Sequence, residues 1–331
     1  MTPSHAADRA ASARRPRRSG RSQRVGLGAL TLASLAAALG TRIPGLSVAA
    51  HFQVQLLAAW AAVLVLLLMP RVRAAFWRPG RVALLAMAWL AWHGTEVGAL
   101  VLPVERPTLL APSPPLDVVW FNMEHDDEAL AALCRDLAAD PPDLLALGEA
   151  NPDSLPTGLE TLSHAARIPQ DGIAVFSSFP LEDPTGIATD DGGRALLALR
   201  LRTPHASLPL VVAHFRQPQY LSHYREVAQL AEHAASRPRL LVLGDLNTTP
   251  WSAEMRRLEA AGLTQARRGR GILPSWSLDP WHLPPFALPI DHVLTRGPIV
   301  VEALSLLPWN GSDHRPLRAR VRFDRAGARP L

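Results

Sequence analysis

The sequence predicts an α/β domain built as a sandwich of packed sheets, preceded by three membrane-spanning helices. Three observations support this prediction. After residue 115, short β-like runs alternate with a few helical ones. Three apolar segments occupy the first third of the chain, and a proline-rich stretch separates the two parts. A length of 331 residues is consistent with about two domains.

The first third is expected to anchor the chain in the cytoplasmic membrane. Its apolar segments are Val25–Thr41, Val48–Met69 and Val82–Val104. At a rise of ~1.5 Å per residue, the first segment is just long enough for ~30 Å of hydrocarbon, and the other two are longer. The arginine-rich tail and the loop at 71–81 indicate a cytoplasmic location for both. Three spans then predict a multi-pass protein with a lipid bilayer as partner and the α/β domain outside the cytoplasm. If the first segment lies along the interface, that domain would instead be cytoplasmic.

The positive charge of the chain is concentrated in this first third. The formal net charge of +5 and the pI near 10.6 are typical of a nucleic-acid binder or a membrane-surface protein. Residues 1–114 carry 13 Arg and three acidic residues, a net charge of +10. Residues 115–331 carry 21 Arg and 26 acidic residues, a net charge of −5. The predicted α/β domain is therefore acidic.

Composition excludes several other classes of protein. Hydrophobic residues make up 48% of the chain, which excludes disorder for most of it. Cys134 is the single cysteine, so an internal disulfide and a cysteine zinc cluster are excluded. Neither a GxGxxG nor a P-loop motif is present.

Five prolines lie within the thirteen residues Pro103–Pro115, and they favour an extended tether over a helix. The sequence therefore divides into five parts: a basic cytoplasmic tail (1–24), a membrane anchor (25–104), a proline-rich linker (105–115), the α/β domain (116–323) and a short tail (324–331).

Within the α/β domain, the apolar runs predict nine strands and three helices. The strands are expected at 116–121, 144–147, 173–176, 195–201, 210–213, 240–243, 290–294, 300–306 and 317–323. The helices are expected at 128–139, 223–235 and 253–261. Many strands with few helices predict packed sheets rather than a regular βαβ array.

Polar side chains recur at the ends of these apolar runs. They are Asn122, Glu149, His214, Asp245, Asn247, Asp291 and the pair Asp313–His314. Each alone has a structural explanation, such as a turn and helix cap at 244–247 or an Asp–Arg ion pair. Because loops at sheet edges hold functional groups on rigid supports, six such strand ends together favour a functional site.

These motifs resemble the endonuclease/exonuclease/phosphatase superfamily of deoxyribonuclease-like metallo-phosphoesterases, and the anchored arrangement resembles its membrane-anchored bacterial members. The motifs stand in family order from about residue 116 to residue 323: Phe121-Asn122-Met123, Gly148-Glu149, His214, Gly244-Asp245-Leu246-Asn247, Ile290-Asp291-His292-Val293-Leu294 and Ser312-Asp313-His314-Arg315-Pro316. The resemblance implies a four-layer α/β sandwich of two packed mixed sheets flanked by helices.

The resemblance also implies a metal site. Glu149 would be the main metal ligand, with Asn122 and Asp313 close by. Hard carboxylate oxygens select Mg²⁺ or Mn²⁺ over zinc. Glu124, two residues after Asn122, is expected at most to support the metal from an outer shell.

The remaining motif residues would carry the catalytic roles of the family. Asp245 would orient or deprotonate the attacking water, and Asn247 would hydrogen-bond the phosphate. His314 would contact the phosphate and act in acid–base or electrostatic catalysis, oriented by Asp291. His214 would serve on the leaving-group side.

Other polar and aromatic residues are expected to be structural. His292 directly follows Asp291 on a strand and so faces the opposite side of the sheet. Trp276, Trp281 and Phe286 lie in a proline-rich loop, where they could contact a base or an acyl chain but are expected to pack.

Together the motifs predict a membrane-anchored, metal-dependent phosphoester hydrolase of the phosphodiesterase or nuclease type. The substrate stays open: it could be a nucleic acid, a nucleotide or a phospholipid head group. The α/β domain, with a net charge of −5, lacks the basic surface that is typical of a nuclease acting on duplex DNA. No obligate protein partner is expected. The competing hypothesis is a non-catalytic binding or scaffold module that retains the hydrolase fold.

Overall fold

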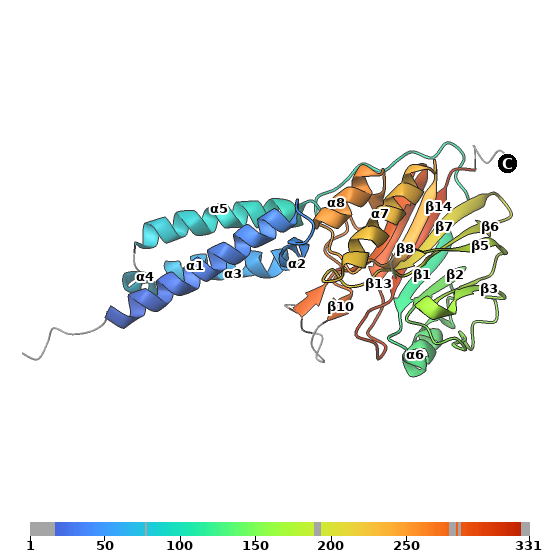
Figure 1. Ribbon diagram of the computed structural model, residues 1–331, viewed down its shortest axis with the longest axis horizontal. Coiled ribbons are helices and arrows are strands. Elements are labelled where there is room, and N and C mark those ends of the chain that lie inside the picture. The colour runs from blue at the N-terminus through green and yellow to red at the C-terminus, as the bar shows by residue number, and fades with distance from the viewer. Residues whose placement is uncertain (1–16, 77, 189–192, 278–282, 284–285, 326–331) are drawn as a thin grey trace, which may run out of the picture.

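The computed structural model describes residues 17–76, 78–188, 193–277, 283 and 286–325. It has two parts: a bundle of helices at one end and an α/β domain at the other (Figure 1). The sequence prediction assigned the wrong character to the first of these parts.

Three long helices form the bundle: α1 (Arg17–Gly40), α3 (Gln53–Leu68) and α5 (Pro79–Gly98). The short helices α2 (Ser47–Ala50) and α4 (Pro70–Ala75) lie at its two ends (Figure 1). Trp60 of α3 is fully buried, and its indole Nε1 donates to Ser34 Oγ of α1 at 2.8 Å. The bundle therefore packs as a unit through its own apolar and polar contacts.

The prediction of three membrane-spanning helices is wrong, and with it the multi-pass localisation and the bilayer partner. Among the described residues, no helix combines the length and the apolar character needed to cross a bilayer. The apolar stretch at 48–69 is broken by a turn at His51 and Phe52, which leaves α3 with 16 residues. A helix of that length spans only about 24 Å, whereas a bilayer core of ~30 Å needs ~20 residues. A count of apolar residues does not reveal this break in the helix.

The α/β domain contains two six-stranded sheets. The first has the order β13-β14-β1-β2-β4-β3, with strands at Ile299–Leu306, Leu317–Phe323, Leu116–Asn122, Leu144–Gly148, Ile173–Ser177 and His164–Ile168. The second has the order β5-β6-β7-β8-β12-β9, with strands at Leu181–Ile187, Leu196–Arg202, Ser207–His214, Leu240–Asp245, Asp291–Arg296 and Thr264–Gln265. Each sheet is mixed, because β1 and β2 pair in parallel, as do β7 and β8, within otherwise antiparallel sheets.

The two sheets pack face to face, and helices cover their outer faces. Alternate residues of β1 show the pattern: Val118 and Trp120 belong to the core between the sheets, whereas Val119 and Phe121 pack against α6 (Asp127–Leu137). Asp126 caps α6 by accepting from the amides of its first turn. On the other sheet, α7 (Leu221–Ala235) and α8 (Ala253–Ala260) cover the outer face. The predicted α/β sandwich of two mixed sheets is confirmed.

The bundle is joined to the α/β domain by specific contacts. Trp251, at the start of α8, is buried with Ala50, Val97 and Leu100 of the bundle. Its indole Nε1 donates to the Ala50 carbonyl at 2.5 Å. The proline-rich stretch is extended and docked on the domain rather than free, since the Ser113 amide donates to the Phe323 carbonyl at 2.8 Å. These contacts hold α2 and the start of α3 at one edge of the sandwich.

Gly244 is required by the close pairing of β7 and β8. A Cβ at this position would lie 2.0 Å from the Ala213 carbonyl oxygen. We expect Gly244→Ala to lower the free energy of unfolding by about 2 kcal/mol or more, because a backbone atom cannot move aside as a side chain can. Denaturant unfolding measures this change.

Gly94→Ala is the matched control, because a Cβ at Gly94 in α5 would meet nothing within 4 Å. It is expected to stabilise the chain by about 0.5–1 kcal/mol through helix propensity. Equal effects of the two substitutions would contradict the close approach of β7 and β8 at Gly244.

Candidate functional site

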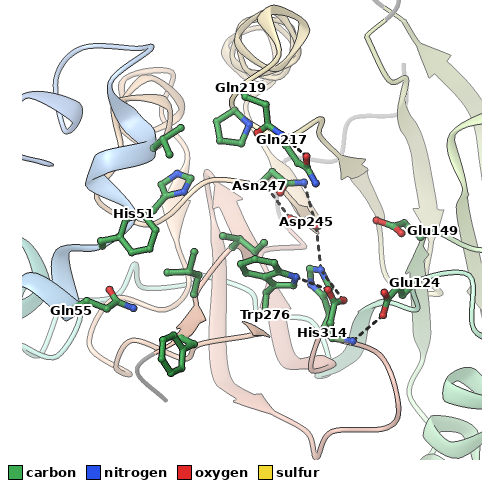
Figure 2. Close-up of a pocket in the computed structure, with 17 residues that line it drawn as sticks. His51, Gln55, Glu124, Glu149, Gln217, Gln219, Asp245, Asn247, Trp276 and His314 are labelled. Atoms are coloured by element: carbon green, nitrogen blue, oxygen red, sulfur yellow. Dashed lines mark hydrogen bonds and ion pairs between the residues drawn. The ribbon is translucent and has the colours of Figure 1, made fainter. Parts of the chain in front are cut away.

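A cavity of about 620 Å³ opens where the carboxyl ends of the central strands meet the helical bundle (Figure 2). Strand register brings the predicted site residues to this edge. In the parallel pair β1–β2, Asn122 lies opposite Gly148, the residue before Glu149. In the parallel pair β7–β8, His214 lies opposite Asp245. Since parallel strands end at the same edge of a sheet, four side chains converge there.

The next strand, β12, completes the arrangement from the opposite direction. It is antiparallel to β8, and its first residue, Asp291, pairs with Asp245. The small ribbon of β10 (Trp276–Ser277) and β11 (Ala287–Leu288) lies beside it. A β-bridge between Trp276 and His314 holds the last motif of the chain against this ribbon. Residues from 122 to 314 thereby surround one cavity.

Asp291 and His314 form a buried carboxylate–imidazole pair. Asp291 Oδ2 accepts from His314 Nδ1 at 2.8 Å. The other oxygen, Oδ1, accepts from the indole of Trp120 at 2.6 Å. Burial alone would lower the pKa of His314, but Asp291, with Asp245 and Asp313, raises that pKa to about 10. This raised pKa favours the imidazolium form of His314, in which Nε2 as well as Nδ1 carries a proton.

Asp245 is 1% exposed and lies between these groups. Its Oδ1 accepts from the Asn247 amide at 2.8 Å, and its Oδ2 from Asn122 Nδ2 at 3.2 Å. Burial and the neighbouring charge of Asp291 raise the pKa of Asp245. A carboxylate with a raised pKa is suited to exchange a proton near neutral pH.

Glu149 lies directly after β2 with a positive φ of 48°, a conformation that is uncommon for a residue with a side chain. Its Oε1 is 3.2 Å from both Asn122 Nδ2 and His214 Nε2. Burial opposes its ionisation, yet the hydrogen bond from His214, with further contributions from Asn122 and His314, lowers the pKa of Glu149 to about 2. The side chain is therefore an ionised carboxylate at the cavity wall.

His214 is almost completely buried behind Glu149. Its Nε2 is also 3.8 Å from Asp245 Oδ2. The guanidinium of Arg194 contacts the same ring. Burial and Arg194 lower the pKa of His214, which favours the neutral imidazole.

The donors around the cavity suit a divalent cation. Glu124, Glu149, Asp245 and Asp313 all line it, and carboxylate oxygens are the ligands that Mg²⁺ and Mn²⁺ prefer. Asp245, Asp291 and His314 also come close enough for one atom from each to meet a single ion. Both oxygens of Asp291 and the Nδ1 of His314 are already hydrogen-bonded, however. Both oxygens of Asp245 also accept hydrogen bonds, so the carboxylates of Glu149 and Asp313 are better placed to bind a metal.

The structure brings all eight predicted site residues into this one network. Five line the cavity: Glu149, Asp245, Asn247, Asp313 and His314. Three support them from behind through the contacts given above: Asn122, His214 and Asp291. Glu124 also lines the cavity, and its Oε2 accepts from the Asp313 amide at 3.2 Å.

The predicted structural role of His292 agrees with its position. It is 1% exposed, and its Nε2 donates to the Thr248 carbonyl at 2.8 Å on the far side of β12. Trp276 and Phe286, which were expected to pack, line the cavity instead. Trp281 lies outside the described residues.

Sequence reasoning missed the polar groups that reach the site from less regular segments. Gln217 and Gln219 come from the loop after β7, and His51 and Gln55 come from the helical bundle. Arg194 was also missed, although it is a cation against His214. For Gln217 and Gln219, the only sequence signal was the Gln-Pro-Gln stretch that follows the strand-end His214.

Comparison with known proteins agrees with the fold. The profile of the Endonuclease/Exonuclease/phosphatase family matches residues 119–314, so the chain belongs to this family. No curated protein sequence matches significantly.

Solved structures show the same fold at low sequence identity. A humanized TDP2 from D. rerio is 15% identical, with 63% of this chain and 99% of that chain covered and a TM-score of 0.52. The 3′ phosphatase NExo from Neisseria is 18% identical, with coverages of 63% and 99% and a TM-score of 0.50. An endonuclease/exonuclease/phosphatase from Beutenbergia cavernae DSM 12333 is 18% identical, with coverages of 64% and 72% and a TM-score of 0.50.

The buried His292 makes folding stability dependent on acid. Desolvation lowers the pKa of His292 from 6.5 to about 3, so the folded state keeps this imidazole neutral. As the pH falls, the histidine is protonated in the unfolded state before it is protonated in the folded state. The free energy of unfolding therefore decreases between about pH 6.5 and pH 3, by up to about 1.4 kcal/mol per pH unit. We expect His292→Gln to make this decline shallower, as measured by denaturant unfolding across the pH range.

The exposed His205 provides the control substitution. His205→Gln is expected to leave the acid decline as it is in the unmodified chain. An identical decline in His292→Gln and the unmodified chain would contradict the assignment of this loss to His292.

Proposed function

We propose that the chain is a divalent-metal-dependent phosphoester hydrolase that directs water in line at a phosphoryl group. The observation that carries this proposal is the hydrogen bond between His314 and buried Asp291, beside a cavity that four carboxylates line. Phosphoryl transfer requires positive charge on the phosphoryl oxygens and an aligned nucleophile. This set of side chains can supply both when a metal is bound.

Glu149, Asn122 and Asp313 are proposed to hold the metal. When bound, the ion supplies positive charge to the phosphoryl oxygens. Glu124 would keep Asp313 in place through its hydrogen bond to the Asp313 amide. The positive φ of Glu149 supports this role, since strained backbone persists mainly where the surroundings require it.

The other residues are proposed to position the water and the phosphate. His314 would donate from Nε2 to a phosphoryl oxygen, while Asp291 holds the ring through Nδ1. Asp245 would accept a proton from the attacking water, which its raised pKa favours. Asn247 donates one amide hydrogen to the Phe215 carbonyl at 2.9 Å, and its second, 3.5 Å from Asp245 Oδ2, would turn to the phosphate.

His214 is proposed to lie on the leaving-group side of the phosphorus. It links Glu149 to Arg194. The guanidinium of Arg194 would add positive charge where negative charge develops on the departing oxygen.

The substrate proposed for this site is a nucleic acid, a nucleotide or another phosphoester. The structure of D. rerio TDP2 contains a single-stranded DNA product, and that of the Neisseria 3′ phosphatase contains a product DNA hairpin. These neighbours support a nucleic-acid phosphoester as one candidate. The net charge of −5 over residues 115–331 favours small or single-stranded substrates over duplex DNA.

Loss of Glu149 or His314 is expected to abolish hydrolysis. The purified full chain is assayed on bis(p-nitrophenyl) phosphate with Mg²⁺ or Mn²⁺. Glu149→Gln and His314→Gln should each lower kcat/KM by about 10²–10⁴-fold, because the first removes a charge that holds the metal and the second a cation directed at the phosphoryl group. Chelation of the metal should abolish turnover, and added Mg²⁺ should restore it.

The exposed Glu160 gives the matched control. Glu160→Gln is expected to retain full activity. A wild-type chain that fails to exceed Glu149→Gln with either metal would refute the hydrolase proposal and favour a non-catalytic binding module.

Asp291→Asn tests the carboxylate–imidazole pair separately. The amide retains the size of the side chain but removes the negative charge beside His314, so the imidazolium is no longer stabilised. We expect kcat to fall by about 10²–10³-fold with little change in KM, because Asp291 lies behind His314 and outside the cavity lining.

Trp120→Phe removes only the indole hydrogen bond to Asp291 Oδ1. A several-fold loss is expected, much smaller than that of Asp291→Asn. Equal kcat values for the wild type and Asp291→Asn would show that the Asp291–His314 hydrogen bond does not hold His314 in its active position.

A further inference from the structure

The helical bundle supplies one wall of the candidate active site. Four residues at α2 and the start of α3 line the cavity: Val48, His51, Phe52 and Gln55. Figure 2 shows His51 and Gln55 on the side opposite Glu124 and Glu149, with Trp276 and His314 between them. The cavity is therefore closed by a segment outside residues 119–314, the range that matches the family.

This wall is held firmly against the α/β domain. The Ala50 carbonyl, between the lining residues Val48 and Phe52, accepts the indole hydrogen bond of Trp251. Arg256 of α8 forms an ion pair with Glu96 of α5 at 2.5 Å. The Gly271 amide donates to the Leu100 carbonyl at 2.9 Å, just beyond α5. Contacts to two different elements of the bundle fix its position relative to the catalytic residues.

The end of the cavity nearest the bundle is apolar and aromatic. Phe52 is 44% exposed and Phe286 is 49% exposed, so each presents a free ring surface. Leu288 and Ile290 line the same cavity. Trp276 joins this end to the catalytic end, because its Nε1 donates to Asp313 Oδ2 at 2.7 Å and its ring centre lies 6.4 Å from that of His314.

The charges of the cavity are divided between its two ends. Its carboxylates and His314 gather around the proposed phosphate position. No Arg or Lys is present among the described residues that line it. The amides of Gln55, Gln217 and Gln219 also line the cavity and carry no charge. A ligand that fills the cavity would place its phosphate at the acidic end with the metal, and a neutral part at the other end.

We infer that the α2–α3 wall, together with Trp276 and Phe286, forms a subsite for the alcohol part of the substrate. The substrate is then a compact phosphoester whose alcohol carries an aromatic ring. Ring surfaces stack on aromatic side chains, and amides hydrogen-bond polar ring edges. A volume of about 620 Å³ falls within the range of ~300–1,000 Å³ that encloses a small ligand. This inference deepens the proposed function and rests on it.

Phosphonates test the subsite apart from catalysis, because their P–C bond is not hydrolysed. The full chain with Mg²⁺ is titrated calorimetrically with methyl-, cyclohexyl- and phenylphosphonate. We expect phenylphosphonate to bind at least ten-fold more tightly than methylphosphonate and more tightly than cyclohexylphosphonate. Equal Kd values for the phenyl and methyl compounds would overturn the subsite, and a cyclohexyl compound that binds as tightly as the phenyl compound would overturn its aromatic preference.

Phe52→Ala and Phe286→Ala test where the aromatic ring of the ligand binds. Each should weaken phenylphosphonate binding by about five-fold and methylphosphonate binding by much less. Trp92→Ala is the matched control, because Trp92 is a 36%-exposed aromatic residue of the same bundle that does not line the cavity. If Trp92→Ala weakens phenylphosphonate binding as much as Phe52→Ala does, the assignment of the ring to this wall is wrong.

A phosphonate analogue of adenosine monophosphate tests whether the ring of the substrate is a nucleobase or a simple aryl group. Binding tighter than that of phenylphosphonate, and dependent on Phe52, supports a nucleobase. Binding weaker than that of phenylphosphonate supports a simple aryl ring.

The aromatic subsite and the hydrolase function can be refuted independently of each other. A chain that hydrolyses bis(p-nitrophenyl) phosphate but shows no phenyl preference loses the subsite and keeps the hydrolase function. A chain that shows the phenyl preference in binding but hydrolyses no ester loses the hydrolase function.

Discussion

The site depends on the buried hydrogen bond between Asp291 and His314. Strand register places the carboxylates of Asp245 and Asp291 opposite each other on neighbouring strands, and both are almost fully removed from water. Two buried carboxylates repel each other unless a cation lies between them. The imidazolium of His314 offsets this repulsion, which is why its pKa rises while that of Asp291 falls. A one-residue slip of β12 would turn Asp291 to the opposite face and leave Asp245 without this compensation.

The same hydrogen bond connects the site to the packing of both sheets. Trp120 belongs to the first sheet and lies in the core between the sheets, and its indole donates across that core to Asp291 of the second sheet. The orientation of His314 therefore depends on how closely the two sheets pack. Side chains on rigid strands hold catalytic geometry better than side chains on loops do. This explains how a site assembled from segments almost 200 residues apart can be preorganised.

The strand-end residues could be predicted from sequence because strands impose a local rule. A polar residue directly after a buried apolar run, such as Asn122 or Asp245, must emerge at the edge of the sheet. The membrane prediction failed because hydropathy alone does not show where a helix breaks, as it does at His51 and Phe52. The role of Phe52 in the cavity was equally hidden. It depends on Trp251 bonding to Ala50, a contact between residues about 200 positions apart that no local pattern records.

The distribution of charge explains why the basic pI of the chain does not describe its active site. The arginines at 17–24 and 71–81 belong to the end of the bundle that points away from the α/β domain (Figure 1). With its 24 residues, α1 is about 36 Å long, several times the Debye length of ~8 Å at physiological ionic strength. Those arginines therefore contribute little to the potential inside the cavity, where carboxylates dominate. Attraction of an anionic substrate would then depend on the proposed metal and His314. A substrate with a single phosphate group and a neutral ring-bearing alcohol matches this arrangement better than a polyanion does.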